Sequence, residues 1–258
     1  MKKEILITND DGFDAKGLKA LIKALENLAH ITVVAPASEK SACSHSLTLT
    51  RPLRFIQVDD DFYKLEDGTP SDCVYLALHS LYGDKKPDLL ISGINRGANM
   101  GEDITYSGTV AGAMEAVLHD VPAISISQVL GSSQHGLDDD YTLAMKVIRD
   151  LAFKVLEGEF PLEHRELINV NVPPLVKEIE YQVTYAGYRF YANDAHLHRN
   201  PRGEEHWWLG LHPLQSKRRD VAGVTDFEAI ESGKISLTPV MLDLTAYKSM
   251  KKLEDFLA

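Results

Sequence analysis

The spacing of apolar residues divides the first half of the chain into strand-like and helix-like segments. Short continuous apolar runs predict buried strands at 5–7, 31–35, 88–92 and 123–127, with two shorter strands at 53–58 and 62–65. Apolar residues at helical spacing predict helices at 16–28, 71–81 and 109–118. This alternation predicts an α/β fold, with a Rossmann-like, mostly parallel sheet that carries helices on both faces.

The second half begins in the same way and then changes character. A helix is predicted at 141–156 and a strand at 167–172, but from about 178 to 219 the helical period is lost. Aromatic residues and histidines cluster at 185–212, and we interpret this stretch as hairpins that leave the core. A strand at 235–239 and a helix at 243–256 close the chain.

The chain carries no repeat, low-complexity segment or flexible linker that would divide it. We therefore expect one domain, 1–258, with its core at about 1–175 and 230–245. A protruding β-hairpin arm is expected at about 178–225 and a C-terminal helix at about 243–256. A length of 258 residues and a hydrophobic content of 44% are sufficient for one large α/β core.

The net charge and the N-terminal sequence indicate which kinds of partner and which cell compartment to expect. The net charge of −11 argues against a binder of nucleic-acid polymers or of membrane surfaces, because either would need a basic face. A small phosphorylated substrate needs only a local positive site. We expect no signal peptide, because an apolar strand begins within four residues and no basic segment precedes an apolar core, and we expect no membrane span, because no apolar stretch approaches the required length. Cys43 and Cys73 lack metal-type spacing and are expected to be reduced thiols, so we expect a cytoplasmic protein.

Two adjacent carboxylates follow the first predicted strand, in the sequence Asn9-Asp10-Asp11-Gly12. Ligands of open α/β sheets bind at the carboxyl ends of the strands, and two neighbouring carboxylates there repel each other unless a cation or a proton compensates. Mg²⁺ and Mn²⁺ take such oxygen ligands. The alternative is a simple turn, because this is also good turn sequence.

Polar loops follow two further predicted strands. The loop at 38–50 contains six hydroxyl residues together with Lys40 and His45, and it either binds phosphate or metal or is merely solvated. A glycine-rich loop after the strand at 88–92 carries Asn95 and Asn99. Ser107, Gly108 and Thr109 then precede a helix of small residues, where backbone N–H groups and the helix dipole favour an anion. The alternative there is an ordinary helix cap with close packing.

These segments resemble the signature of the SurE family of stationary-phase survival proteins. The matching segments are Thr8-Asn-Asp-Asp-Gly12, Ser92-Gly-Ile-Asn-Arg-Gly-Ala-Asn99 and Tyr106-Ser-Gly-Thr-Val110, followed by Asn169-Val-Asn-Val-Pro173, Thr225-Asp226 and Ser236-Leu-Thr-Pro239. The resemblance therefore covers essentially the whole chain. It implies a metal-dependent phosphatase of nucleoside monophosphates, assembled as a dimer or tetramer in which the C-terminal arm is exchanged.

The resemblance also implies residue roles. One divalent ion per subunit, Mg²⁺ or Mn²⁺, would be held by Asp10, Asp11, Ser41 and Asn95. The substrate phosphate would be bound by Asn99, Ser107, Gly108 and Thr109, and the catalytic group would be Asp10, Asp11 and Asn99. The sequence departs from the family pattern at Ala42, where many members have glycine. Ala42 restricts the backbone if that position needs a positive φ, and Ser44 is the substitute ligand for Ser41 in that case.

The expected reaction is attack of a metal-activated water on a nucleoside 5′-monophosphate, with 3′-nucleotides and polyphosphate left open as substrates. An aspartyl-phosphate intermediate is the chemical alternative, and it is disfavoured because the aspartates of such phosphatases are separated by one residue. A non-catalytic nucleotide-binding module and a purely structural oligomer are the remaining alternatives. Trp207 and Trp208 either anchor a subunit interface or stack on a nucleobase, and we favour the interface.

Overall fold

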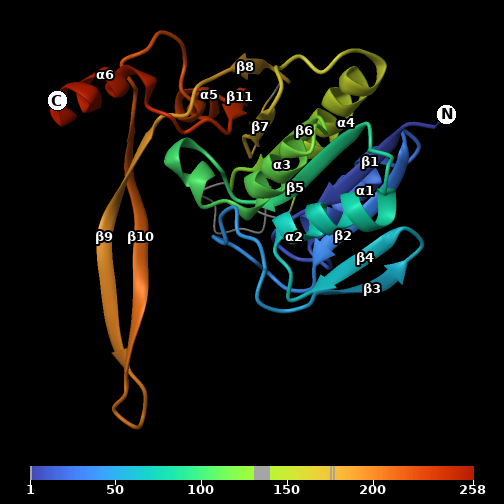
Figure 1. Ribbon diagram of the computed structural model, residues 1–258, viewed down its shortest axis with the longest axis horizontal. Coiled ribbons are helices and arrows are strands. Elements are labelled where there is room, and N and C mark those ends of the chain that lie inside the picture. Colours follow the sequence, from blue (N-terminus) through green and yellow to red (C-terminus); the bar gives the residue numbers. More distant parts are fainter. Residues whose placement is uncertain (1, 131–139, 175, 177) are drawn as a thin grey trace.

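Nine strands form the central sheet of the computed structural model, which describes residues 2–130, 140–174, 176 and 178–258 (Figure 1). Their order across the sheet is β3-β4-β2-β1-β5-β6-β7-β11-β8. The strands are β1 (Glu4–Thr8), β2 (His30–Pro36), β3 (Arg54–Asp59), β4 (Phe62–Glu66), β5 (Leu89–Arg96), β6 (Ala123–Gln128), β7 (Glu166–Val172), β8 (Tyr181–Val183) and β11 (Ile235–Met241). The series β4, β2, β1, β5, β6 and β7 is parallel throughout, whereas β3 and β11 run antiparallel to their neighbours β4 and β7. The predicted mostly parallel α/β sheet is confirmed.

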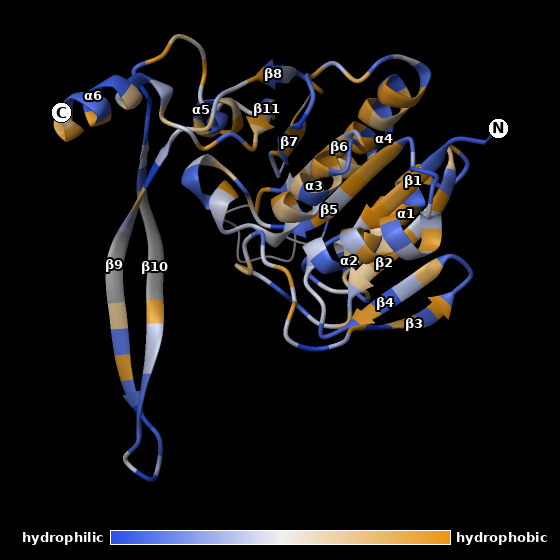
Figure 2. Cartoon of the chain, viewed as in Figure 1, coloured by the Kyte–Doolittle hydropathy of each residue, from blue (hydrophilic) through white to orange (hydrophobic). Residues whose placement is uncertain are grey.

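Helices cover both faces of this sheet, as predicted (Figure 1). One face carries α1 (Lys16–Leu25) and α4 (Thr142–Glu157), and the other carries α2 (Pro70–Leu76), its π-helical continuation η1 (Ala77–Tyr82) and α3 (Gly108–Leu118). Side chains of β1 alternate between the faces: Ile5 and Ile7 pack with α1 and α4, and Leu6 packs with α2 and α3. Figure 2 shows the resulting concentration of hydrophobic residues in the central strands.

Several element boundaries differ from the sequence prediction. The first helix ends at Leu25, because Glu26 has an extended backbone and Asn27 has a φ of +68°. The helix predicted at 71–81 begins at Pro70, capped by the Thr69 side chain, and becomes a π-helix from Ala77 onward. Three short elements were not predicted at all: β8, the 3-10 helix η2 (Gly101–Thr105) and α5 (Asp226–Glu231). Each is too short to show a hydrophobic period of its own.

The predicted arm is a single long antiparallel hairpin of β9 (Tyr188–Arg199) and β10 (Glu205–Lys217). It extends away from the sheet, and the C-terminal helix α6 (Tyr247–Leu257) lies close to its base (Figure 1). Helix α6 starts four residues later than predicted, after a turn in which the Asp243 carboxylate accepts from the Thr245 N–H at 2.9 Å. None of the described helices is both long and apolar enough to cross a bilayer.

The chain reverses its direction of growth across the sheet between β1 and β5. From β1 it moves to β2 on one side and later returns to place β5 on the other side. In open α/β sheets the crevice at such a reversal, beyond the carboxyl ends of the two strands, is where ligands bind. The pair Asp10–Asp11 follows β1, and Asn95 lies at the end of β5, so the topology places both at this crevice.

Candidate active site

The turn after β1 is largely buried and is held by hydrogen bonds. Asn9 and Asp10 are buried, and the Asn9 side-chain amide donates to the Gly12 carbonyl at 2.9 Å. Gly12 has a φ of +99°, a conformation that favours glycine. The Asp10 carbonyl accepts from the Lys40 N–H at 2.7 Å, which fastens the 38–50 loop to the end of β1. These contacts fix the place of the two carboxylates at the end of β1.

Asp10 is held by the first turn of α3. The Thr109 hydroxyl donates a short hydrogen bond to Asp10 Oδ1. Burial raises the pKa of Asp10 to about 6; the Thr109 hydrogen bond lowers it, and the neighbouring Asp11 charge raises it. The net result is a carboxyl that is costly to ionise without a cation close by.

Asp11 is more exposed and faces the end of β5. Its Oδ2 accepts from the Arg96 N–H at 3.0 Å, across the crevice between β1 and β5. Burial raises the pKa of Asp11, the Arg96 hydrogen bond lowers it, and the charge of Glu39 raises it. Two adjacent carboxyls with raised pKa values are typical of a site that binds a cation.

The 38–50 loop brings Ser41 to the same place. Ser41 and Glu39 line a cavity of about 310 Å³ together with Asp11 and Arg96, and the Ser41 hydroxyl donates to Glu39 Oε1 at 2.8 Å. The sequence left open whether position 42 needs a positive φ. It does: Ala42 has a φ of +57°. Alanine therefore occupies a left-handed conformation at a cost of roughly 1 kcal/mol.

Ser44, the substitute for Ser41, also has a left-handed backbone, with a φ of +53°. Its N–H donates to the carbonyl of Tyr106 at 3.0 Å, so the loop is tied to the segment that leads into α3. The cavity beside Asp11 is lined by Ser41 and not by Ser44. The geometry thus favours Ser41 as the hydroxyl of this site.

The N-terminus of α3 lies directly against Asp10. Ser107 caps the helix, since its hydroxyl oxygen accepts from the Val110 N–H at 3.0 Å. A Cβ at Gly108 would lie 2.8 Å from Asp10 Cβ and 2.8 Å from Cys43 Sγ, so only glycine allows this approach. The predicted anion site and the carboxylate pair are therefore neighbours in space.

Asn95 and Asn99 have different surroundings. The Asn95 side-chain NH₂ donates to the Gly97 carbonyl at 2.9 Å, which leaves its Oδ1 available. The Asn99 side-chain NH₂ donates to Ser127 Oγ at 2.8 Å, at the end of β6. Among the described contacts, the Asn99 side chain makes none with Asp10 or Asp11.

Two buried asparagines of β7 hold the Asn99 backbone. Asn171 Oδ1 accepts from the Asn99 N–H at 2.9 Å. The Asn99 carbonyl accepts from the Asn169 and Asn171 side chains at 2.8 and 3.0 Å. Sequence reasoning gave these asparagines no role. The available signal was their i, i+2 spacing in an apolar strand, since buried polar side chains need partners.

The donor set fits a hard divalent cation. Carboxylate oxygens of Asp10 and Asp11, the amide oxygen of Asn95 and the hydroxyl of Ser41 are the ligand types of Mg²⁺ or Mn²⁺. Within the described residues, Asn9 Oδ1 is buried beside this turn without a hydrogen-bond partner. No group of three His, Cys, Asp or Glu side chains in the described ranges is arranged to hold a metal ion, so a zinc-type site has no support.

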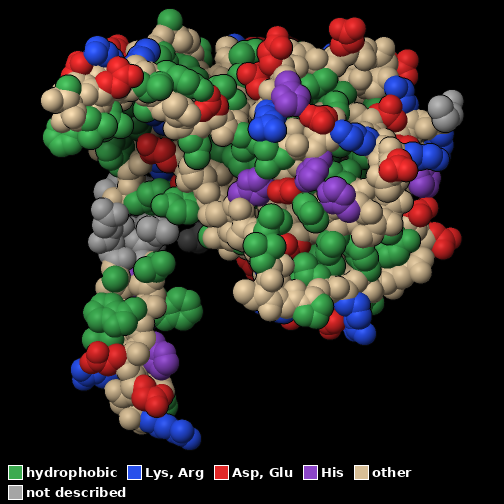
Figure 3. Space-filling model, in the orientation of Figure 1, with side chains coloured by type: hydrophobic (Ala, Val, Ile, Leu, Met, Phe, Trp, Pro, Cys, Tyr) green, Lys and Arg blue, Asp and Glu red, His purple; other side chains and the backbone are tan. Residues whose placement is uncertain are grey.

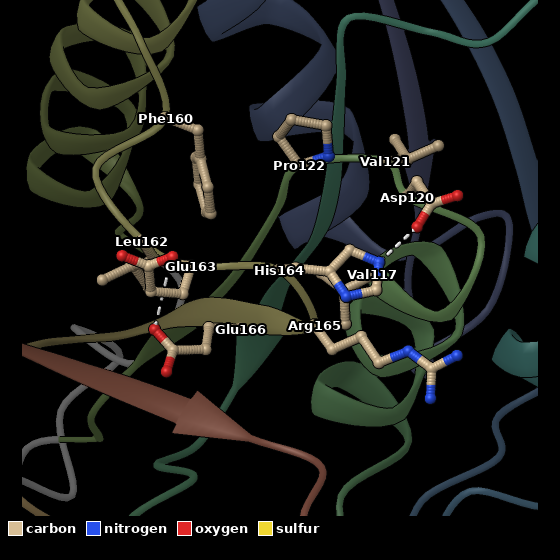
Figure 4. Close-up of a pocket in the computed structure, with 10 residues that line it drawn as sticks. All are labelled: Val117, Asp120, Val121, Pro122, Phe160, Leu162, Glu163, His164, Arg165 and Glu166. Atoms are coloured by element: carbon tan, nitrogen blue, oxygen red, sulfur yellow. Dashed lines mark hydrogen bonds and ion pairs between the residues drawn. The ribbon is translucent and has the colours of Figure 1, made fainter.

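Two other cavities lie away from this crevice. One of about 210 Å³, at the end of α3, is lined by apolar residues and by the pair His164–Asp120, whose Nε2 and Oδ1 are 2.5 Å apart (Figure 4). The other, of about 1030 Å³, lies at the amino ends of β1, β2 and β5 and is lined by Lys3, His30 and Tyr82, among others. Neither contains two adjacent carboxylates beside a helix N-terminus, so the crevice at β1 and β5 is the candidate active site.

Comparison with known proteins gives a consistent result. Residues 5–193 match the family model of survival protein SurE. The chain is 63% identical to the 5′-nucleotidase SurE of Sulfurimonas denitrificans, with all of both chains covered, and 56% identical to that of Helicobacter hepaticus, with 97% of each covered. The crystal structure of the SurE protein from Aquifex aeolicus superposes with a TM-score of 0.79 at 39% identity, covering 99% of this chain and 100% of that one. The chain therefore belongs to the SurE family.

Proposed function

We propose that this protein is a metal-dependent 5′-nucleotidase that hydrolyses nucleoside monophosphates. The observation that carries the proposal is the contact between the N-terminus of α3 and the Asp10–Asp11 pair at the point where the sheet reverses. An anion-binding helix end beside a cation-binding carboxylate pair is what a phosphate monoester requires. Close relatives named 5′-nucleotidase SurE support the same reaction.

One Mg²⁺ or Mn²⁺ ion per subunit is proposed at Asp10, Asp11, Ser41 and Asn95. Such an ion, when bound, would offset charge on the phosphate and lower the pKa of a water ligand. Thr109 keeps Asp10 oriented, and the Arg96 N–H does the same for Asp11. The more exposed Asp11 is the better placed of the two to accept a proton from the attacking water.

The substrate phosphate is proposed at Asn99 and at Ser107, Gly108 and Thr109. The backbone N–H of Gly108, together with the Ser107 hydroxyl hydrogen, supplies donors to its oxygens. The Thr109 hydroxyl and the Thr109 N–H both donate to Asp10, so Thr109 binds the phosphate by exchanging one of these hydrogen bonds. One hydrogen of the Asn99 side-chain NH₂ is donated to Ser127 Oγ, and the second remains as a donor for the phosphate.

An aspartyl-phosphate mechanism is the chemical alternative. It would need Asp10 or Asp11 as the nucleophile, yet Asp10 is only 4% exposed and is engaged by Thr109. Rapid-quench reactions with ³²P-labelled substrate decide between the two mechanisms. Acid-stable label on the protein would establish the phosphoenzyme, whereas its absence during turnover supports direct attack of water.

We also propose a homodimer or homotetramer built through the C-terminal arm. Trp207, Trp208 and Leu209 on β10 are 62, 67 and 79% exposed. Hydrophobic side chains gather along the arm and over the C-terminal helix on the face shown in Figure 3. A second copy of the chain would cover such a surface. A cytoplasmic setting is part of the proposal, and the unbonded Cys43 and Cys73 support it.

A substrate panel tests the proposal. Phosphate release is measured from nucleoside 5′- and 3′-monophosphates and from polyphosphate, each with Mg²⁺, Mn²⁺ or EDTA. We expect turnover of 5′-monophosphates that needs the metal and stops with EDTA. A protein that binds nucleotides in EDTA and releases no phosphate with either metal would be a binding module instead.

A further inference from the structure

The two halves of the proposed phosphate site are joined by the short 3-10 helix η2. Asn99 precedes η2 by two residues, and Ser107 follows it by two. Helix η2 therefore helps to set how the N-terminus of α3 lies relative to Asn99, whose backbone is held by β7. Residues at the base of the arm and at the start of α5 form hydrogen bonds and an ion pair with η2, although they lie far from it in the sequence.

The Asp226 carboxylate links η2 to the arm through backbone groups alone. Asp226 is fully buried at the start of α5. Its Oδ2 accepts from the Gly101 N–H at 2.6 Å, and its Oδ1 accepts from the Gly187 N–H at 3.0 Å. Gly101 begins η2, and Gly187 directly precedes β9. The Asp226 carboxylate thus joins the start of η2 to the base of the arm.

Side chains of η2 make a second set of contacts with β9. Glu102 Oε2 accepts from the Arg189 N–H at 2.7 Å, and the Arg189 guanidinium Nε lies 3.4 Å from Asp103 Oδ2. The Tyr191 hydroxyl donates a short hydrogen bond to Asp103 Oδ1. Arg189 and Asp103 are each only 17% exposed, so this pair is shielded from the screening that weakens surface ion pairs.

The backbones of η2 and of the base of the arm also approach each other so closely that only glycine fits at the contact. A Cβ at Gly101 would lie 2.9 Å from the Gly187 carbonyl and 2.9 Å from the Phe227 ring. A Cβ at Gly187 would lie 2.9 Å from Phe227 Cδ2. The Arg189 guanidinium covers the same ring, 5.2 Å from its centroid. Hydrogen bonds, an ion pair and steric fit therefore act on one junction.

We infer that Asp226 and Arg189 are positioning residues that hold η2 against the base of the arm and thereby fix the geometry of the phosphate site. The inference rests on the proposed phosphatase function. It makes the arm more than an assembly device, since a displacement of its base would shift η2, and with it the first turn of α3, relative to Asn99, which β7 holds. A displacement of about 1 Å in a positioned group can cost about 100-fold in rate.

The test compares variants at the junction with one at the far end of the same hairpin. Asp226→Ala removes the carboxylate link, and Asp226→Asn retains one acceptor oxygen. Arg189→Ala removes the guanidinium that pairs with Asp103 and keeps the backbone bond to Glu102. Arg199→Ala is the matched control, because Arg199 forms an exposed pair with Glu205 at the other end of β9. Three quantities are measured for each folded variant: kcat and KM for a nucleoside 5′-monophosphate, inhibition by inorganic phosphate, and Mn²⁺ affinity by calorimetry.

We expect Asp226→Ala to lower kcat/KM by roughly 10- to 100-fold and to weaken inhibition by phosphate, with Mn²⁺ affinity within about 2-fold of wild type. Arg189→Ala should lower kcat/KM and weaken inhibition by phosphate to a smaller extent. Asp226→Asn should retain more of the wild-type kcat/KM than Asp226→Ala does, and Arg199→Ala should match wild type. Asp226→Ala is the variant most at risk of misfolding; in that case Arg189→Ala decides.

Unchanged phosphate inhibition in folded Arg189→Ala and Asp226→Asn would overturn the inference. Equal losses of phosphate and Mn²⁺ binding would also overturn it, because they would indicate a general structural role. A wild-type protein without metal-dependent phosphatase activity would instead contradict the proposed function, so the two failures are distinguishable.

Discussion

At the scale of single residues, Asp10 shows how the fold prepares a site. Its carboxyl is buried, the next residue in the sequence is a second aspartate, and the Asp10 carboxyl accepts hydrogen bonds from the Thr109 hydroxyl and the Thr109 N–H. Burial raises its pKa from 3.8 to about 6, which corresponds to something on the order of 3 kcal/mol against the ionised form. A divalent ion that needs the ionised carboxylate must offset that cost.

This shift predicts how pH controls stabilisation by metal. In metal-free protein the pKa of Asp10 is higher in the folded state than in the unfolded state. Protonated Asp10 therefore contributes its full stabilisation below pH 3.8, the ordinary pKa of aspartate, and this stabilisation is lost as the pH rises through about 6. Bound Mn²⁺ requires the ionised form, so the increase in Tm caused by Mn²⁺ over EDTA should be small near pH 4.5 and should grow through pH 6. Thermal melts across this range check it, with Asp10→Asn as the control that loses the increase. An equal increase at pH 4.5 and pH 7.5 would contradict the assignment.

Ala42 gives a second prediction at this scale. A φ of +57° is roughly 1 kcal/mol less favourable for alanine than for glycine. Replacement by glycine removes this strain, but glycine also has a greater conformational entropy in the unfolded state, which offsets part of the gain in stability. We expect Ala42→Gly to stabilise the protein by about 0.5 kcal/mol with Mn²⁺ affinity retained. Ala20→Gly, inside α1, is the control and should destabilise by about 0.5–1 kcal/mol. Urea unfolding measures both, and a clear destabilisation by Ala42→Gly would refute the strain at this position.

At the scale of elements, the sequence predicted the strands and longer helices that have their own hydrophobic period. It missed η2, β8 and α5, which owe their conformation to long-range contacts such as Asp226 with Gly101. It also placed Asp10, Asn95 and Ser107 at strand and helix ends, and the topology then brought those ends together. The hydrogen bonds of Thr109 with Asp10 and of Asn171 with Asn99 were beyond prediction, because they join residues 99 and 72 positions apart.

The approach of α3 to β1 can be tested at Gly108. An added Cβ would meet Asp10 Cβ and Cys43 Sγ at 2.8 Å, so Gly108→Ala must push the helix end away from the carboxylate. We expect a loss of about 1–3 kcal/mol in stability and at least about 10-fold in kcat/KM. Met114→Ala, later in the same helix, should destabilise without a comparable loss of activity. If both variants lose activity in proportion to stability alone, the close approach has no specific role.

At the scale of the whole molecule, the described part of the chain leaves a large apolar surface exposed. In α6, Met250, Leu253 and Leu257 recur at helical spacing and are 50, 60 and 76% exposed, and Phe256 beside them is 82% exposed. Burial of such a stripe stabilises by roughly 1.5–3 kcal/mol per large side chain. An isolated subunit would therefore expose a surface that a second copy of the chain can bury.

Charge on this stripe should dissociate the oligomer. We expect wild type to be a dimer or tetramer in solution and Leu253→Asp/Phe256→Asp protein to shift toward monomer, because two buried carboxylates would lose their hydration. Lys252→Ala is a control on the same helix. Light scattering after size exclusion gives the mass of each, and a monomeric wild type at tens of micromolar would refute this assembly.

We propose that Asp10 and Asp11 hold the divalent ion on which phosphate hydrolysis depends. Calorimetric titration of Mn²⁺ into wild type and into Asp10→Asn/Asp11→Asn protein, with phosphate release from a nucleoside 5′-monophosphate measured on the same samples, tests it most directly. The account predicts one bound ion per wild-type chain, and loss of both binding and hydrolysis in the variant, which remains folded. A folded variant that binds Mn²⁺ as tightly as wild type, or that still hydrolyses the substrate at the wild-type rate, would contradict it.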